Sequence, residues 1–137
     1  KNVTVMAGGR EVSLDAIEHD ILRPRFGDSR VHYAVNCASI GCPNLMARAW
    51  RSDTLDADLE AGARAYINHP RGVTVTEDGL VVSRIYDWFN EDFGGSDAGV
   101  IAHVLRYAEP GLAQRIDGDT RITSYAYDWS LNRVVSP

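Results

Sequence analysis

The chain contains two cysteines, Cys37 and Cys42, and both lie in the segment VHYAVNCASIGCPN at residues 31–44. Cys37 has the small neighbours Ala38 and Ser39, so a thiol at this position is sterically accessible, as a nucleophile must be. Free cysteine is also a common small hydrophobe in protein cores, and accessibility alone does not decide its role. A thiol nucleophile needs a base to activate it, and the four histidines of the chain are the candidates.

His19 fits the role of general base best. It lies on the flank of a helical apolar pattern, where its ring can reach a cleft. The other histidines fit less well: on a regular strand, His32 and Cys37 would face opposite sides. His69 is placed to assist a helix C-terminus, and His103 borders an apolar stripe and is expected to pack. The alternative for His19 is a solvated helix histidine without a function.

Glu18 lies inside the apolar stripe of the same predicted helix. A carboxylate half buried among Leu and Ile must be paired, hydrogen-bonded or raised in pKa, and such local inconsistencies tend to occur at functional sites. The alternative is a structural ion pair with an arginine such as Arg30 or Arg48. Asp15 precedes His19 by one helical turn and is placed to bind one ring nitrogen.

Two aromatic and acidic clusters, at residues 86–95 and 124–132, each join a tryptophan to an aspartate. Such clusters can line a cleft or orient a histidine, although aromatic residues are more often part of the core. Asp92 and Asp128 are therefore the candidates for the acid that orients the histidine.

The cysteine pair has three interpretations. Gly41 makes a disulfide between Cys37 and Cys42 geometrically feasible, but the closed loop would be small and would stabilise little. A metal site formed by His32, Cys37 and Cys42 lacks the tight spacing of zinc motifs and a fourth ligand. In the third interpretation Cys37 attacks a substrate while Cys42 packs, resolves or protects; no metal and no cofactor are expected there.

The elements that must position these residues alternate between hairpins and helices. The predicted elements are a hairpin turning at Gly8-Gly9, a helix over 14–23 with Ser13 as N-cap and Pro24 as its end, a strand over 30–37, a helix over 54–69 ended by Pro70, a hairpin turning at Asp78-Gly79, helices over 85–93 and 97–108, a shorter helical piece over 109–116 and a strand over 120–129. This order predicts an α+β fold with a small mixed or antiparallel sheet and about four helices.

The composition indicates one globular domain over residues 1–137, with 45% hydrophobic and 24% charged residues. A net charge of -5 without a Lys/Arg run disfavours a nucleic acid as the main partner. No apolar run approaches the roughly 18 residues that a membrane span needs. The expected partner is a small-molecule or peptide substrate that the sequence does not identify.

Four ordered motifs give the chain a family resemblance. They are SLDAIEHDILRP, VHYAVNCASIGCP, RIYDWFNEDFGG and YDWSLN, and they contain Ile17-Glu18-His19, Cys37, Trp88 with Asp92-Phe93, and Tyr127-Asp128-Trp129-Ser130. With these motifs the chain resembles the bacterial DUF547 family of uncharacterised domains over nearly its whole length.

The resemblance carries three implications. Typical members have an additional upstream helix, so the chain is expected to be the C-terminal portion of the family's usual extent, with an N-terminal segment that completes the fold. Similar bacterial proteins are often exported, which implies a periplasmic or extracellular location. Plant relatives resemble this chain at Glu18, His19 and Cys37 but carry serine in place of Cys42, which argues against an obligatory disulfide or a two-cysteine metal site.

The leading hypothesis is a thiol-dependent hydrolase or acyltransferase of the papain or transglutaminase sort. Cys37 is its nucleophile and His19 its general base, and Glu18, Asp92 or Asp128 orients or charges the histidine. The alternative is a binding or scaffold domain in which Glu18 and His19 belong to a buried polar network. A redox role for the cysteine pair is the third hypothesis.

Overall fold

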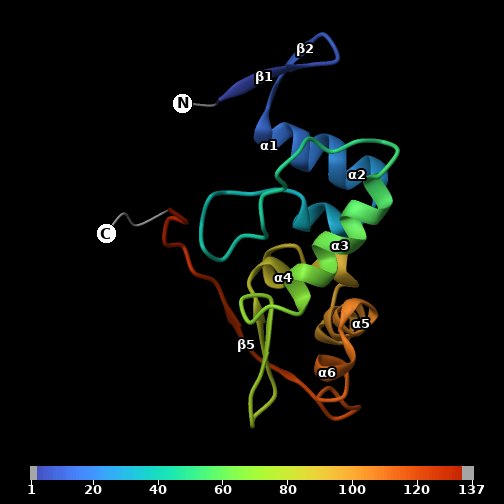
Figure 1. The fold of residues 1–137 in the computed structure, drawn as a ribbon, viewed down its shortest axis with the longest axis vertical. Helices are drawn as coiled ribbons and strands as arrows, with labels where there is room; N and C mark the ends of the chain where they lie inside the picture. Colours follow the sequence, from blue (N-terminus) through green and yellow to red (C-terminus); the bar gives the residue numbers. More distant parts are fainter. Residues whose placement is uncertain (1–2, 134–137) are drawn as a thin grey trace.

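The structure is a computed structural model and describes residues 3–133 (Figure 1). Its α-helices and strands alternate with one π-helical segment, η1, and two 3-10 helices, η2 and η3. In chain order the elements are β1 (Thr4–Ala7), β2 (Arg10–Ser13), α1 (Leu14–Ala16), η1 (Ile17–Leu22), α2 (Arg23–Phe26), η2 (Ser29–Tyr33), α3 (Leu55–Ile67), β3 (Val73–Val75), β4 (Leu80–Ser83), α4 (Ile85–Trp88), η3 (Asn90–Phe93), α5 (Asp97–Tyr107), α6 (Pro110–Ala113) and β5 (Ile122–Ala126).

Strands β3, β4 and β5 form a small mixed sheet in that order. The hairpin β3–β4 is antiparallel and pairs Val73 with Val82, whereas β5 runs parallel to β4. A parallel neighbour requires a crossover connection, which α4, η3, α5 and α6 supply between the two strands. The predicted α+β fold with a small mixed sheet is confirmed.

The core lies between this sheet and the helices α3 and α5. Its buried members come from all of these elements: Ala63, Tyr66 and Ile67 on α3, Val73, Leu80 and Val82 on the sheet, Ile85, Tyr86 and Phe93 after β4, and Val100, Val104 and Tyr107 on α5. The helical spacing of apolar residues in α3 and α5 is therefore explained by burial on one face. This body carries the loops that follow η2 and β5.

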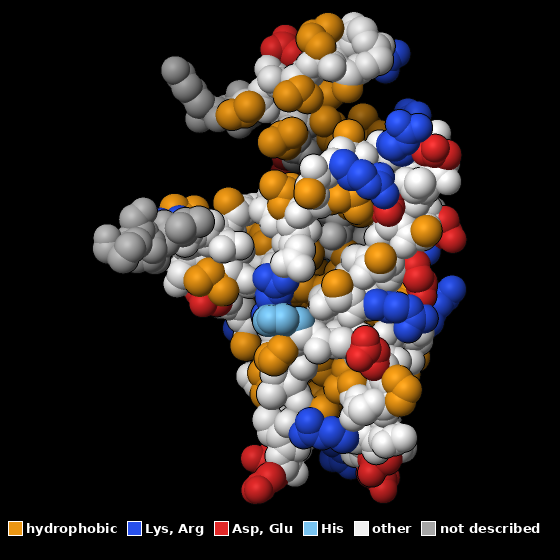
Figure 2. Space-filling view, in the orientation of Figure 1, with side chains coloured by type: hydrophobic (Ala, Val, Ile, Leu, Met, Phe, Trp, Pro, Cys, Tyr) orange, Lys and Arg blue, Asp and Glu red, His pale blue; other side chains and the backbone are white. Residues whose placement is uncertain are grey.

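The N-terminal hairpin β1–β2 confirms the prediction for residues 4–13. Gly8 and Gly9 have φ angles of 59° and 76°, the left-handed conformation that a two-residue hairpin turn requires. The hairpin extends from α1 away from the rest of the molecule (Figure 1), and hydrophobic side chains lie on its surface (Figure 2). Val5 and Met6 are among these exposed side chains.

The first helical region begins as predicted but does not end at Pro24. Ser13 caps α1 by accepting the backbone N–H of Ala16. The chain then continues through η1 and α2 to Gly27, whose φ of 57° ends the helix in the left-handed conformation. The wider turn of η1 directly precedes Pro24 and relieves the clash that a proline ring makes with the preceding turn of an α-helix. The predicted end at residue 23 is therefore wrong.

The predicted strand over 30–37 is also wrong, because this segment forms the 3-10 helix η2 and a loop. Asp28 starts η2 by accepting the backbone N–H of Arg30. The consecutive residues His32 and Tyr33 are both buried, whereas neighbouring side chains of a strand point to opposite faces. The cap by Asp28 and the burial of both His32 and Tyr33 thus outweigh the β propensity of this segment.

The remaining predicted elements are present. The β3–β4 hairpin, the glycine break between η3 and α5, the short helix α6 and the last strand β5 all fall within their predicted ranges. Helix α3 ends before Pro70, also as predicted. None of the helices within residues 3–133 combines the length and the apolar character that a membrane crossing requires.

Candidate active site

A pocket of about 260 Å³ joins the cysteine loop to η1, η2 and the aromatic segments that follow β4 and β5. Cys37 and His32 line it together with Glu18. Trp88 and Trp129 contribute its aromatic wall, with ring centroids 5.3 Å apart. Both tryptophans are more than one third exposed and line a cleft, whereas Tyr86 and Phe93 of the first cluster belong to the core.

Cys37 is held in a constrained turn. The side chain of Asn36 accepts the backbone N–H of Ala38 at 2.7 Å and donates to the carbonyl oxygen of Pro43 at 2.7 Å. Ala38 has a φ of 63°, a left-handed conformation that costs a non-glycine residue about 1–2 kcal/mol. This strain lies directly beside the candidate nucleophile, which is where strained backbone often accompanies function.

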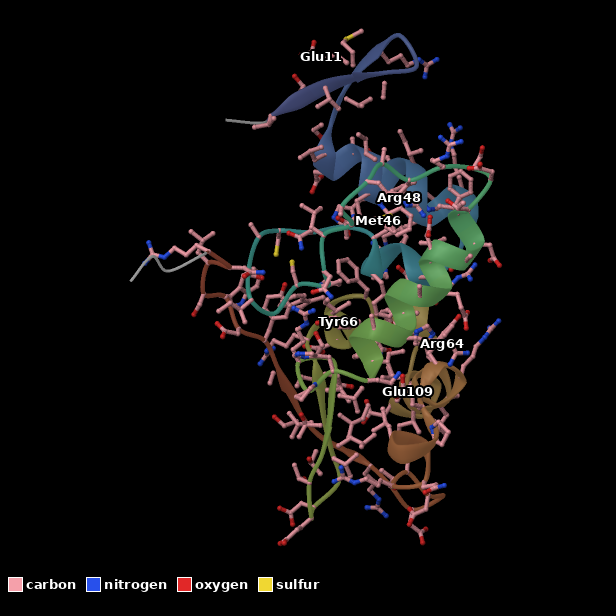
Figure 3. All side chains as sticks on the ribbon, viewed as in Figure 1. Glu11, Met46, Arg48, Arg64, Tyr66 and Glu109 are labelled. Carbon is pink, nitrogen blue, oxygen red and sulfur yellow. The ribbon has the colours of Figure 1, made fainter. Side chains whose placement is uncertain are left out.

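The C-terminal segment and α3 hold the loop after Cys37 in place. Ile40 N–H donates to the carbonyl oxygen of Ser130, and Gly41 N–H to that of Asp128, each at 2.8 Å. From the other side the hydroxyl of Tyr66, labelled in Figure 3, donates to the carbonyl oxygen of Gly41 at 2.7 Å. The loop is thereby fixed between two elements that are distant in sequence.

The Cys37 thiol belongs to a small hydrogen-bonded group. Its Sγ lies 3.1 Å from Ser39 Oγ and 3.3 Å from Tyr127 Oη. The backbone N–H of Cys37 donates to Cys42 Sγ at 2.9 Å, and Tyr127 Oη lies 3.2 Å from the same sulfur. Partial burial acts to raise the pKa of Cys37, but hydrogen bonds from Cys42, Ser39 and Tyr127 outweigh it and lower the pKa to about 7. A substantial thiolate fraction is therefore present at neutral pH.

His32 is fixed by a carboxylate and an aromatic ring. Its Nε2 lies 2.7 Å from Asp92 Oδ2, and the same oxygen accepts a hydrogen bond from Arg23 Nε at 2.6 Å. The imidazole stacks on Phe89 with ring centroids 4.1 Å apart. Nδ1 of His32 is buried and has no hydrogen-bond partner within residues 3–133. The ring thus presents one acceptor that no described group uses.

Electrostatics keep this histidine neutral and its partner charged. Burial lowers the pKa of His32, against the opposing effect of Asp92. Burial acts to raise the pKa of Asp92, but hydrogen bonds from Arg23 and His32 outweigh it and hold the pKa below its usual range. A neutral imidazole that donates Nε2–H to a carboxylate has its lone pair on Nδ1, so it can accept a proton there.

His19 lies outside the residues that line the pocket. It is exposed, and its ring nitrogens face Asp15 at 3.6 Å, as the sequence predicts, and Arg23 at 3.3 Å. Glu18 does line the pocket. The arginine partner considered for Glu18 is not found, because Arg30 pairs with Asp28 and Asp56, and Arg48 pairs with Asp58.

The two candidate orienting acids have different positions. Asp92 contacts a histidine, but that histidine is His32. The side chain of Asp128 turns back to accept the N–H of Ser130, and its contribution to the site is the backbone carbonyl that holds Gly41. Of the two, only Asp92 contacts a histidine among the described residues.

The structure also bears on the disulfide and metal interpretations. Both cysteines are free thiols, Cys37 exposed and Cys42 buried. Within residues 3–133 no three or more His, Cys, Asp or Glu side chains form a group that could hold a metal ion.

Sequence reasoning missed three residues that contact the candidate site. A strand over residues 30–37 would turn His32 away from Cys37, whereas the 3-10 helix η2 lets both residues line the pocket. Tyr127 and Arg23 carry no local signal: their roles arise from contacts with residues that are far away in sequence. In the sequence Tyr127 lies within the second aromatic and acidic cluster and in the last motif of the family resemblance, but neither places it beside Cys37.

Comparisons with known proteins give one match. The family described as "Protein of unknown function, DUF547" matches residues 1–67, a range that includes Glu18, His19, His32 and both cysteines. The two later motifs of the resemblance, around Trp88 and Trp129, lie beyond the matched range. No curated protein and no solved structure matches the chain. Over residues 1–67, just under half of its length, the chain is therefore similar to the DUF547 family.

Proposed function

We propose that the chain carries the site of a thiol-dependent hydrolase or acyltransferase, with Cys37 as nucleophile, His32 as general base and acid, and Asp92 as the carboxylate that orients the histidine. The reaction class is acyl transfer from an ester or amide. The proposal keeps the nucleophile and one acid expected from the sequence, and it replaces His19 by His32 as the base.

The observation that carries the proposal is the unpartnered Nδ1 of His32. A buried polar atom without a partner is costly, and such atoms call for an explanation. Nε2 of His32 donates its proton to Asp92, so Nδ1 carries the lone pair and can accept a proton. His32 lines the same pocket as a thiol whose pKa is about 7. Nucleophile, base and orienting acid are the groups that this chemistry requires.

In the proposed reaction the Cys37 sulfur, having given its proton to His32 Nδ1, attacks the carbonyl carbon of the substrate. The carbon–sulfur bond forms as the bond to the leaving amine or alcohol breaks, and the leaving group takes the proton from His32. Water then gives a proton to His32 and attacks the thioester, which releases the acid and the thiol. In an acyltransferase, an acceptor amine or hydroxyl takes the place of water.

Cys37 Sγ hydrogen-bonds to Ser39 and Tyr127 rather than to His32 in the free protein. Catalytic hydrogen bonds are often long or absent before substrate binds, so this arrangement is compatible with the proposal. The proposal requires the Cys37 side chain to turn toward His32 when the substrate binds, and both residues line the same pocket.

The test is acyl transfer from activated esters and peptide anilides, followed by turnover and by acid-quenched mass spectrometry of the protein. The proposal expects an acyl adduct on Cys37, none in Cys37→Ser, and strongly slowed acylation in His32→Gln. His19→Gln is the matched control and should react like the wild type. Thermal melting verifies that each variant folds.

Two outcomes contradict the proposal. If His19→Gln stops acylation while a folded His32→Gln reacts normally, the base is His19, as the sequence pattern suggested. If the wild type forms no adduct with any ester or anilide, the domain is better described by the scaffold hypothesis, in which His32 and Asp92 order the interior.

A further inference from the structure

We propose that Cys37 and Cys42 form a peroxide-sensitive thiol pair, in which a hydroperoxide oxidises Cys37 and Cys42 resolves the product to an intramolecular disulfide. This is a modification site in addition to the proposed acyl transfer, and it does not depend on turnover of any substrate. The disulfide considered for the sequence was a structural one, whereas this one forms only on oxidation.

The two thiols lie on either side of a single hydroxyl group. Tyr127 Oη lies 3.3 Å from Cys37 Sγ and 3.2 Å from Cys42 Sγ. Cys42 Sγ also accepts the backbone N–H of Cys37 at 2.9 Å. The two sulfurs are therefore neighbours around one hydroxyl group, and the proposed disulfide requires the Cys37 side chain to turn toward Cys42.

The loop between the two cysteines already forms a turn in the reduced protein. Residues 39–42 form a turn in which Cys42 N–H donates to the carbonyl oxygen of Ser39 at 3.2 Å. Hydrogen bonds from Ile40 and Gly41 to the C-terminal segment fix the same turn from outside. The loop-closure entropy of the disulfide is thus already lost on folding, which favours bond formation.

The two thiols differ in solvent exposure, since Cys37 is exposed and Cys42 is buried. Cys37 is exposed on the pocket, so a small oxidant reaches it, and its lowered pKa supplies thiolate at neutral pH. Cys42 is 4% exposed, so it is protected from direct oxidation and is available only to an oxidised Cys37. An accessible, acidic thiol beside a resolving cysteine is the arrangement of a redox-sensitive pair.

The oxidation proceeds in two steps, with the hydroperoxide as the two-electron oxidant. The Cys37 thiolate attacks one oxygen of the hydroperoxide, the O–O bond breaks, and the leaving oxygen takes a proton to give water or an alcohol. Cys37 is then a sulfenic acid, and the Cys42 sulfur attacks its sulfur. The S–S bond forms, the S–O bond breaks, and the hydroxide leaves as water with the proton of Cys42.

The experiment treats the reduced protein with hydrogen peroxide at neutral pH and follows intact mass, peptide maps and tryptophan fluorescence. Tryptophan emission is informative because Tyr127, which contacts both sulfurs, packs against Trp88 and Trp129 at centroid distances of 4.9 and 4.7 Å. The wild type should lose the mass of two hydrogens, yield a peptide pair linked through Cys37 and Cys42, and recover on addition of a dithiol.

The cysteine variants separate the two roles. Cys42→Ala should stop at the sulfenic acid, which dimedone traps on Cys37, and Cys37→Ala should remain unmodified under the same treatment. If a variant does not fold, the mass change and the peptide map of the oxidised wild type still test the disulfide. Oxidation of the wild type straight to sulfinic acid, modification of Cys42 in the Cys37→Ala variant, or disulfides only between separate chains would overturn the proposal. None of these readouts depends on acyl transfer, so the two proposals fail independently.

Discussion

His32 Nε2 lies 2.7 Å from Asp92 Oδ2, while Nδ1 of the same ring is buried without a partner. An ionised carboxylate only accepts hydrogen bonds, so Nε2 carries the proton and Nδ1 the lone pair. Hydrogen bonds from Arg23 and His32 hold the pKa of Asp92 below its usual range. The carboxylate on η3 therefore sets the tautomer of the histidine, and Arg23 on α2 contacts the same carboxylate from a distant part of the sequence.

Asp92→Asn should abolish most acyl transfer by removing the negative charge beside His32. One oxygen of Asp92 contacts both Arg23 Nε and His32 Nε2, so an amide oxygen in its place can still accept from both but no longer stabilises the protonated imidazole that forms during the reaction. We expect kcat/KM to fall by roughly 10²–10⁴-fold, the range found when an orienting acid or a general base is lost. Steady-state kinetics with the best ester substrate measure this change.

Arg23→Gln is the matched control for Asp92→Asn. It removes the same partly exposed ion pair, for which a loss of about 1 kcal/mol of unfolding free energy is expected, but it leaves the carboxylate on Nε2. Its kcat/KM should therefore stay well above that of Asp92→Asn at similar stability. Equal losses of activity in the two variants would contradict a role for the negative charge of Asp92 beside His32.

Alkylation of Cys37 should follow a titration with a midpoint near pH 7. The thiolate reacts and the thiol does not, so the rate should fall as the pH drops through the Cys37 pKa of about 7. Tyr127→Phe removes one of the hydrogen bonds that favour the thiolate and should move the midpoint to higher pH. Peptide mass spectrometry after timed exposure to iodoacetamide measures the rate at each cysteine separately.

Cys42 is the internal control for the alkylation experiment, because it is 4% exposed in the folded protein. It should react only after denaturation. A midpoint for Cys37 near the ordinary value for cysteine, or a midpoint that Tyr127→Phe leaves unchanged, would contradict the role given to this hydroxyl.

Local patterns in the sequence predict most of the elements correctly. The turns at Gly8-Gly9 and before Leu80, the cap at Ser13 and the apolar stripes of α3 and α5 depend on neighbours in the chain, and all are present. The failures occur where tertiary contacts decide. Residues 30–37 have β propensity, but burial of both His32 and Tyr33 is incompatible with a strand that has one buried face.

The candidate site shows the same limit. Cys37 and Asp92 carry local signals, a loop with small neighbours and an aromatic and acidic cluster; Cys37 lines the pocket and Asp92 contacts His32. A strand over residues 30–37 would turn His32 away from Cys37, so the sequence favours His19, whereas in the structure His32 lines the pocket. The contact of Tyr127 with the thiol joins residues 90 positions apart and has no local signature.

Ala38→Gly should stabilise the fold or leave it unchanged, whereas Ala38→Val should destabilise it. The φ of 63° at this position suits glycine and is worst for a β-branched side chain. Relief of strain, reduced by the extra entropy of glycine in the unfolded chain, gives an expected gain of up to about 1 kcal/mol. The valine variant should lose about 1–2 kcal/mol.

Urea unfolding of the two Ala38 variants and the wild type checks this order of stability. A glycine variant less stable than the wild type would show that residue 38 does not keep its left-handed conformation in solution. Acylation measured on the same samples tests whether the strain also serves the nucleophile, in which case the more stable glycine variant should react more slowly.

The free energy of unfolding should fall as the pH drops from 6.5 toward 4, and His103 should cause a large part of this change. Burial is the main reason that the pKa of His103 falls from 6.5 to about 4, with a smaller contribution from Arg106 and an opposing one from Asp28. Between these two pH values the unfolded chain binds a proton that the folded protein excludes. The stability from the neutral ring is therefore complete above pH 6.5 and is lost as the pH falls through this window.

His103→Gln removes this titration and should flatten the dependence of stability on pH. Because one proton contributes at most about 1.4 kcal/mol per pH unit, the difference in slope between wild type and variant is measurable by urea unfolding at several pH values. His32 also has a lowered pKa, so some slope should remain in the variant. His103→Gln also removes the hydrogen bond between Tyr33 and His103, and its cost is measured separately at pH 7.5, where His103 and His32 are both neutral. Parallel curves for the two proteins between pH 6.5 and 4 would contradict the assignment of this proton to His103.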